Sequence, residues 1–376
     1  MAKRISIGTW AYTIGPYQND PVPFEEVCSK LKELKFDGLE LGAFNFHANA
    51  HPNPTNCPTK ESRQAVLETM NKYGLEFSGI AVDLWSYPGH EIHLADAIDG
   101  GAGYLAEFRK QLDFTCDLGI KLFRVDTVQP PNLLVGATPS DIDLARANVI
   151  KTWKEASKIA ADRGVDLSWE FEPGFVFNRP SDIIRIINEI DEPNFGAMFD
   201  TCQAYTVGVV GTRQTGGTPE TVEGGVLGFA KKLRGRINHI QLMDSDGSLS
   251  DINNLSFHAP FFTGKIDFGP VLEELNAHSG VKHDWWTIDP CFWPDAWPGT
   301  AEAKKACDLL NRKYGESAAA KPAARVKSVP APRKAAAKPA KKKPAPKKKA
   351  APKAKAKAKP KAKPIKKTVK KAKVRR

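Results

Sequence analysis

The sequence lacks the long apolar runs, paired cysteines and glycine motifs that mark several large protein classes. No stretch approaches the ~20 apolar residues of a membrane-spanning helix, and the amino-terminal MAKRISIGTW is too polar for a signal peptide. The six cysteines show no CxxC spacing, which predicts reduced thiols. No GxGxxG follows the first expected strand, which argues against a dinucleotide-binding fold. We therefore expect a cytoplasmic protein with no membrane partner.

The end of the chain, residues 317–376, lacks both acidic and aromatic residues. Of the chain's 55 Lys and Arg, 25 fall in this segment, whereas all 43 Asp and Glu fall in residues 1–316. The formal charge is therefore −13 for the body and +25 for the tail. A segment so rich in Lys, Ala and Pro buries too little apolar surface to offset the entropy of ordering. We expect two parts, a folded domain over 1–316 and a disordered basic tail over 317–376.

The tail resembles the carboxyl-terminal tails of linker histones and of basic nucleoid proteins in composition. A flexible polycation binds nucleic acid or another polyanion by releasing condensed counterions, with little sequence preference. This predicts nucleic-acid binding in the cytoplasm, with association to the nucleoid; the alternative is a tail that aids solubility or screens the acidic body. The basic clusters expected to contact phosphate are Lys341, Lys342, Lys343, Lys347, Lys348, Lys349, Lys366, Lys367, Lys370, Lys371, Arg375 and Arg376.

The body alternates strand and helix patterns eight times. Strands are expected at 4–12, 37–44, 75–85, 120–128, 166–173, 195–203, 239–247 and 285–292. Helices are expected at 23–35, 60–74, 93–119, 140–164 with Ser140 as N-cap, 179–191, 218–236, 267–280 and 300–315. Such alternation with short turns predicts a parallel sheet, and eight repeats favour closure into a (β/α)8 TIM barrel.

Four of the expected strands carry a polar residue near their carboxyl ends. Successive side chains of a strand point to opposite faces, and Glu170, Asp200, Gln241 and Asp289 all lie on the face opposite the apolar stripe. In a parallel barrel the carboxyl ends of the strands meet at one rim, where catalytic residues lie. Three carboxylates and an amide meeting there predict a bound cation or shared protons.

The body resembles the xylose-isomerase-like barrel superfamily of sugar phosphate isomerases and epimerases. The resemblance covers residues 4–313 and rests on ISIGTWAY, FDGLELG, WEFEPG, FDTCQAY, HIQLMDSDG, HAPFFTGKIDF and WWTID in this order. It implies a divalent metal held by Glu170, Asp200, the position of Gln241, and Asp289. It also implies that Glu170 and Asp289 act as the acid/base pair that moves a proton between two sugar carbons through an enediolate.

Two departures from the family pattern bear on the metal. Gln203 and Gln241 stand where the family has histidine, and Phe262 stands where it often has glycine, which we expect to narrow the loop over the site. A glutamine carbonyl ligates Mg²⁺ or Mn²⁺ but is a poor ligand for Zn²⁺, so the sequence favours Mg²⁺ or Mn²⁺. The partner implied is a small sugar or sugar phosphate.

Further residues near the expected mouth are candidates for substrate contact, each with a structural alternative. His258 lies in the loop after the seventh strand, and Glu172 either orients substrate or is a solvated rim residue. Arg124 either binds sugar or phosphate or forms an interior ion pair with Asp126. The remaining candidates are Trp10 as a stacking ring, His239 as a substitute ligand or a buried hydrogen-bonded histidine, and Gln203.

Three functions remain open from the sequence. The first is a metal-dependent isomerase or epimerase of a small sugar or sugar phosphate. The second is a degenerate barrel that binds a carbohydrate or serves as a folded head for a DNA-binding tail, which the two glutamines favour. The third is an apurinic-site endonuclease, whose histidine-rich metal cluster the chain matches least. Both a monomer and an oligomer are compatible with the sequence.

Overall fold

The computed structural model describes residues 2–44, 51–84, 101–127, 137–214, 218–251 and 254–316. Contacts within the chain divide it into two units, 1–325 and 326–376, and every described residue lies in the first. The basic tail over 317–376, with all the residues expected to contact phosphate, lies outside the described residues.

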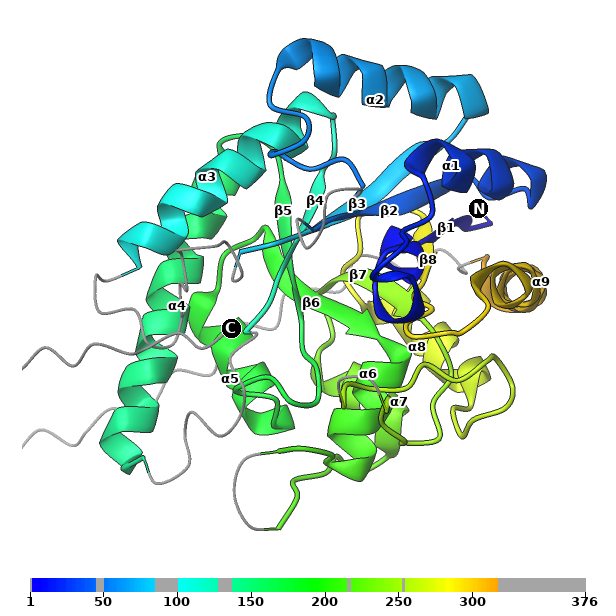
Figure 1. Ribbon diagram of the computed structural model, residues 1–376. Helices are drawn as coiled ribbons and strands as arrows, with labels where there is room; N and C mark the ends of the chain where they lie inside the picture. Colours follow the sequence, from blue (N-terminus) through cyan, green and yellow to red (C-terminus); the bar gives the residue numbers. More distant parts are fainter. Residues whose placement is uncertain are drawn as a thin grey trace, which may run out of the picture. The chain divides into compact units, whose positions relative to one another are not determined.

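Eight parallel strands form a nearly closed barrel, which confirms the predicted fold class (Figure 1). The strands are β1 Arg4–Ile7, β2 Gly38–Ala43, β3 Glu76–Val82, β4 Leu122–Val125, β5 Asp166–Glu170, β6 Phe195–Asp200, β7 Ile237–Leu242 and β8 Trp285–Ile288. From β2 to β8 each strand pairs with the next one along the chain, and β8 pairs with β1. A single parallel bridge between Gly8 and Glu40 joins β1 to β2 and completes the circle.

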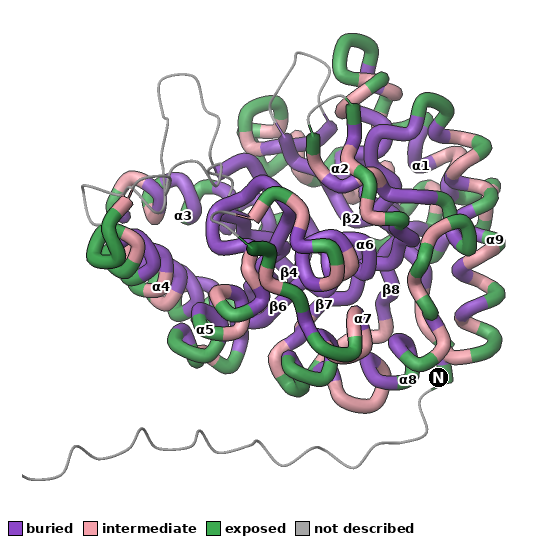
Figure 2. The backbone as a smooth tube through the Cα atoms, turned by 90° about the horizontal axis from the view of Figure 1, so that it is seen from below, coloured by how far each residue is buried: buried purple, intermediate pink, exposed green. Residues whose placement is uncertain are grey.

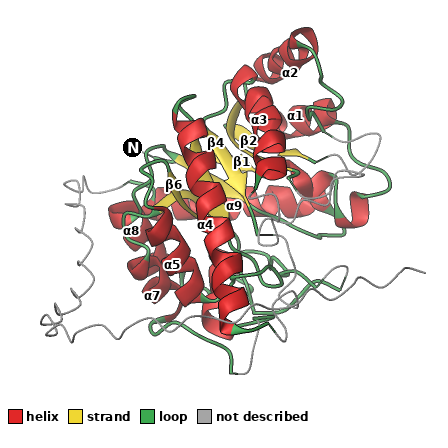
Figure 3. Cartoon of the chain, turned by 90° about the vertical axis from the view of Figure 1, so that its left-hand side faces the viewer, coloured by secondary structure: helices red, strands yellow, loops and turns green. Residues whose placement is uncertain are grey.

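Helices surround the strands, as Figures 1 and 3 show. They are α1 Phe24–Glu33, α2 Lys60–Tyr73, α3 Ala102–Asp117, α4 Pro139–Ala161, α5 Pro180–Ile190, α6 Thr201–Tyr205, α7 Gly225–Lys232, α8 Phe268–His278 and α9 Ala296–Tyr314, with 3₁₀ turns η1 Thr9–Tyr12 and η2 Gly15–Tyr17 and a π-helix η4 Thr206–Val210. In the described part of the chain, every helix is too short or too polar to cross a bilayer.

The hydrophobic core lies between the strands and the helices, because the apolar face of each strand points outward. Trp169 of β5 packs on Trp153 of α4 with ring centroids 5.2 Å apart, and both rings are fully buried. Figure 2 shows the strands largely buried and the helices partly exposed, and the exposed or half-buried strand residues lie near the amino-terminal ends. The polar residues of the strands consequently face the barrel interior, as the alternation predicts.

Helix α4 begins two residues earlier than expected, so the prediction of Ser140 as its N-cap is wrong. Thr138 is the N-cap: its hydroxyl accepts from the N–H of Asp141 at 3.2 Å, and the Asp141 carboxylate accepts from the N–H of Thr138 at 2.9 Å. Pro139 fits the first helical position because its missing N–H would have no helical partner there. The reciprocal capping box outweighs the single hydroxyl of Ser140.

The first strand is shorter than expected, which moves Trp10 off the sheet. The strand ends at Ile7, and Trp10 lies on η1. The indole lies directly against Gly8, where an added Cβ would come within 2.2 Å of the ring. Glycine at this position therefore lets the chain turn inward and bring the buried Trp10 ring over the barrel mouth.

Candidate functional site

The four residues expected to hold a cation lie at the same end of the barrel. Glu170 and Asp200 end β5 and β6, Gln241 is the penultimate residue of β7, and Asp289 directly follows β8. Asp200 and Gln241 are register partners in adjacent strands. All four residues are at most 1% exposed. The strands, not mobile loops, therefore position these side chains.

Oxygen atoms of three of these residues are buried and have no hydrogen-bond partner. They are Oε1 of Glu170, Oδ2 of Asp200 and Oε1 of Gln241. A buried polar atom left unpaired costs roughly 1–3 kcal/mol, so each of these oxygens needs an explanation. Carboxylate and amide oxygens are the ligands that hard divalent cations take. The residues present therefore fit a bound divalent cation.

Glu40 on β2 fixes the orientation of Gln241, and the strand pattern did not single it out. Its Oε2 accepts a hydrogen bond from Nε2 of Gln241 at 3.0 Å. The amide nitrogen is thus turned away from the other ligands, and the amide oxygen is left free. Burial opposes ionisation of Glu40, but His239, Gln241 and Arg124 outweigh it and lower its pKa. The signal in the sequence was an acidic residue in the middle of the apolar strand GLELGA.

His239 lies deeper in the barrel, where both ring nitrogens have partners. Nε2 is 3.0 Å from Oε2 of Glu40 and 3.0 Å from Oγ1 of Thr287. Nδ1 is 3.3 Å from Nε2 of His283. The ring is fully buried. This arrangement supports the hydrogen-bonded alternative for His239 over a role in contact with substrate.

Arg124 on β4 is surrounded by three buried carboxylates. Its guanidinium contacts Asp126 at 2.9 Å, Glu172 at 2.8 Å and Oε2 of Glu170. Its side chain is 9% exposed, and the guanidinium carbon lies 5.8 Å from the centre of the Trp10 ring. One buried guanidinium can balance the charge of only one of the three carboxyl groups. Ionisation of all three together would therefore need a further cation.

Burial and mutual repulsion raise the pKa values of three carboxyl groups at the mouth. Burial, only partly offset by Arg124, raises the pKa of Glu170 well above its usual range. Burial and the neighbouring Asp289 raise the pKa of Asp200 well above its usual range. Burial also raises the pKa of Glu172 to about 7, against the opposing effect of Arg124. A divalent cation reverses this effect, because it stabilises the ionised carboxylates.

Three further side chains lie at the mouth: Gln203 of α6, His258 of the segment between β7 and α8, and Trp10 of η1. Nε2 of His258 lies 3.3 Å from the amide nitrogen of Gln203, and the side chain of Gln203 accepts from Ser256 at 2.7 Å. The Trp10 Nε1–H donates to Oδ1 of Asp289. The structure thus brings His258, Gln203 and Trp10 to the rim with the strand-end carboxylates, although no sequence periodicity related them.

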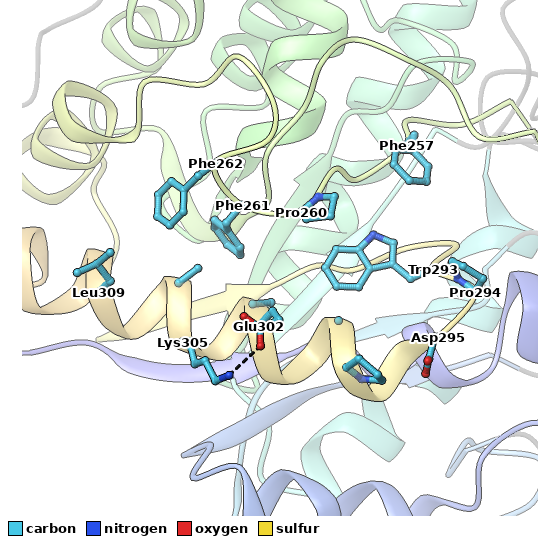
Figure 4. A pocket seen from close by; sticks show the side chains of 14 residues that line it. Phe257, Pro260, Phe261, Phe262, Trp293, Pro294, Asp295, Glu302, Lys305 and Leu309 are labelled. Carbon is cyan, nitrogen blue, oxygen red and sulfur yellow. Dashed lines mark hydrogen bonds and ion pairs between the residues drawn. The ribbon is translucent and has the colours of Figure 1, made fainter.

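A separate apolar cavity of about 590 Å³ lies beside the mouth, between α9 and the 257–262 segment (Figure 4). Trp293 forms one wall, and its Nε1–H donates to the carbonyl oxygen of His258 at 2.6 Å. None of the four strand-end ligands lines this cavity. Phe262 lines it with a φ of 66°, a left-handed conformation that favours glycine. The expectation that Phe262 narrows the loop over the site is therefore wrong, because its ring packs on Phe261 and Phe268.

Comparison with known proteins places the barrel in a family. A family model described as the xylose isomerase-like TIM barrel matches residues 28–313. Among curated protein sequences, none matches the chain.

Solved structures with the same fold include sugar-converting proteins at low identity. A xylose isomerase domain protein from Planctomyces limnophilus is 16% identical with a TM-score of 0.56, covering 83% of this chain and 98% of that one. D-psicose 3-epimerase from Clostridium cellulolyticum H10, solved with D-tagatose, is 15% identical with a TM-score of 0.59, covering 83% and 99%. The IolI protein, solved with a zinc atom, is 15% identical with a TM-score of 0.57, covering 83% and 99%.

Proposed function

The chain belongs to the xylose isomerase-like TIM barrel family, and from this premise we propose that it is a metal-dependent isomerase or epimerase of a small sugar or sugar phosphate. The observation that carries the proposal is the set of unpartnered oxygens on Glu170, Asp200 and Gln241. They point to a divalent cation, and the all-oxygen set favours Mg²⁺ or Mn²⁺. When bound, the cation would polarise the substrate's hydroxyl and carbonyl oxygens and offset charge developing on them.

The protein's own residues supply the proton transfer. Glu170 ends β5 and Asp289 directly follows β8, with Asp200 and Gln241 between them in the barrel. One carboxylate takes a proton from a carbon bearing a hydroxyl, which leaves an enediolate. In an epimerase the other carboxyl group then donates its own proton to the opposite face of that carbon; in an isomerase the neighbouring carbon receives the proton, and the hydroxyl proton passes to the former carbonyl oxygen. Arg124 holds Glu170 in place, and Trp10 holds Asp289. Burial of both carboxylates keeps bulk water from the enediolate during the transfer, whereas their own protons exchange with solvent between turnovers.

The proposal is tested by solvent-deuterium incorporation into the carbon-bound hydrogens of a panel of ketoses and ketose phosphates. We expect deuterium in one sugar with Mg²⁺ or Mn²⁺ present and none after chelation. Glu170→Gln should lower the exchange rate by at least about 100-fold, because it removes the acid/base group. Glu274→Gln is the matched control: Glu274 is also a buried glutamate paired with an arginine, but on α8.

A binding-only barrel is the second candidate, and one contact favours it. The Arg124 guanidinium touches Oε2 of Glu170, where a cation ligand would otherwise face the metal. If Arg124 replaces the cation, the mouth binds a polyhydroxyl compound without converting it. Sugar binding by calorimetry without any deuterium exchange, with or without divalent cations, would establish this alternative.

For the tail we propose binding to DNA or another polyanion, with association to the nucleoid as a consequence. The support is its charge of +25 without a single acidic residue, against −13 for the body. We expect the full chain to bind duplex DNA without sequence preference and residues 1–316 not to bind. The log–log slope of affinity against salt should be about −0.9 for each phosphate neutralised. Gel-shift titrations across a salt series measure this, and equal binding by both proteins would refute it.

A further inference from the structure

A cysteine and a histidine outside the oxygen ligand set converge on Asp200. A carboxylate oxygen of Asp200, Sγ of Cys202 and a ring nitrogen of His258 lie within 4.8 Å of one another, and all three residues are buried. Cys202 lies in the first turn of α6, and His258 lies in the segment between β7 and α8. Thiolate and imidazole are ligands that Zn²⁺ and Co²⁺ prefer, in contrast to the all-oxygen set.

The hydrogen bonds of His258 place its lone pair on Nε2. Nδ1 faces the main-chain carbonyl oxygen of Asp289, which only accepts hydrogen bonds, so the proton of the neutral ring lies on Nδ1. Nε2 then accepts from the amide of Gln203, whose orientation Ser256 fixes. A ring N–H given to a main-chain carbonyl is the usual arrangement of a metal-binding histidine.

The two other ligand atoms are also incompletely bound. Oδ1 of Asp200 accepts from the N–H of Gln203 at 2.7 Å, whereas Oδ2 has no partner and the residue is fully buried. The Cys202 thiol has a contact of 3.6 Å to the carbonyl oxygen of Phe257, a weak hydrogen bond. Three protein ligands leave a fourth position open, which is the pattern of zinc sites that bind substrate.

A second group at the mouth has similar residues but different hydrogen bonds. Ligand atoms of His258, Asp289 and Cys291 also lie within 4.8 Å of one another. The ring nitrogen nearest this carboxylate is Nδ1, 3.5 Å from Oδ2, and it carries the proton. Oδ1 of Asp289 already accepts from Trp10 and from the Cys291 thiol. The nitrogen of His258 nearest this group carries the proton and therefore cannot bind a metal ion. Cys291 thus serves as a control for Cys202.

We propose that Asp200, Cys202 and His258 form a second cation position, for a thiophilic divalent ion such as Zn²⁺, beside the oxygen ligands. The proposal rests on the proposed function, because Asp200 serves both positions. On binding, the Cys202 thiol releases its proton to solvent, a sulfur–metal bond forms, and the Gln203 amide leaves Nε2. Cys202 and His258 would thus supply the sulfur and nitrogen ligands that glutamine cannot supply at positions 203 and 241.

The test is Co²⁺ titration of the full chain, reduced and stripped of metal, followed by absorption. The tail contains no Cys or His, so it offers no competing soft ligands. We expect a thiolate-to-cobalt charge-transfer band in the near ultraviolet that Zn²⁺ abolishes. Cys202→Ser should remove the band and weaken Co²⁺ binding at least about 100-fold. Loss of a residue that only supports a metal ligand lowers metal affinity by up to about 100-fold, and loss of a direct ligand should cost at least as much. Cys291→Ser should keep the band.

A wild-type protein without the band, or a band lost in Cys291→Ser and kept in Cys202→Ser, would overturn the proposal. Mn²⁺ binding by electron paramagnetic resonance separates this failure from that of the proposed function. Bound Mn²⁺ without a cobalt–thiolate band overturns only the second position, whereas binding of neither ion overturns both. If Cys202→Ser does not fold, His258→Ala should weaken Co²⁺ binding to the same extent, and unchanged affinity would also refute the proposal.

Discussion

Asp200→Asn should abolish divalent-cation binding while leaving the fold intact. Asp200 is shared by both proposed cation positions, and its Oδ2 is buried without a partner. Asparagine removes the negative charge but keeps a side-chain oxygen for the N–H of Gln203, so α6 keeps its N-cap. We expect calorimetry to detect no Mn²⁺ or Co²⁺ binding, and we expect deuterium exchange into sugar to disappear with it.

The control for this prediction is Asp246→Asn, which removes an exposed carboxylate after β7 that accepts from the N–H of Ser248. Its cation affinity should equal that of the wild type. Circular dichroism should show the same secondary structure for both variants. Undiminished Mn²⁺ binding by a folded Asp200→Asn protein would exclude Asp200 as a ligand and refute the proposed cation site.

Arg124→Met should cost about 3–5 kcal/mol of the free energy of unfolding at neutral pH in the metal-free protein, the range for breaking a buried ion pair. The substitution leaves Asp126, Glu170 and Glu172 buried together without their shared cation. Mn²⁺ should recover part of the loss, because it supplies positive charge to Glu170. Urea unfolding with and without Mn²⁺ measures both effects.

Arg146→Met is the matched control for Arg124→Met. Arg146 is also a buried arginine paired with two carboxylates, but the side chains of Asp143 and Asp182 are 66% and 20% exposed. Without Arg146, water still solvates the Asp143 and Asp182 carboxylates. The expected decrease in the free energy of unfolding is therefore smaller and independent of Mn²⁺. Equal destabilisation of the two variants would show that the three carboxylates do not depend on Arg124.

Strand periodicity predicted the fold and the placement of four candidate ligand residues at one end of the barrel, because it follows directly from backbone geometry. In a parallel barrel all strands end at one rim, so Glu170, Asp200, Gln241 and Asp289 had to converge once the eight strands were found. The same alternation places Glu40 inside the barrel, but it does not tell that Glu40 reaches the amide of Gln241. That contact depends on which side chains face each other across the interior.

Strand periodicity could not predict the positions of residues that lie on turns and loops. Trp10 reaches Asp289 because the chain turns at Gly8, and His258 reaches Gln203 through a segment without regular structure. The start of α4 was misplaced for a related reason, since the capping box of Thr138 and Asp141 fixes it and helical periodicity does not identify a cap. The assignment of individual roles to the mouth residues stays a prediction.

The ligand residues all come from the second half of the barrel, whereas the residues that hold them come from the first half. Glu170, Asp200, Gln241 and Asp289 lie on β5 to β8 or directly after, and Trp10, Glu40 and Arg124 lie on η1, β2 and β4. The seam at which the barrel closes lies at Gly8, which bridges to Glu40 and whose N–H bonds to the carbonyl oxygen of Ile288 at 2.9 Å; it lies next to the Trp10–Asp289 contact. Local opening of that seam would separate Trp10 from Asp289. Amide hydrogen exchange at Gly8 should therefore slow when a cation binds, because binding of the cation and local opening of the barrel are coupled.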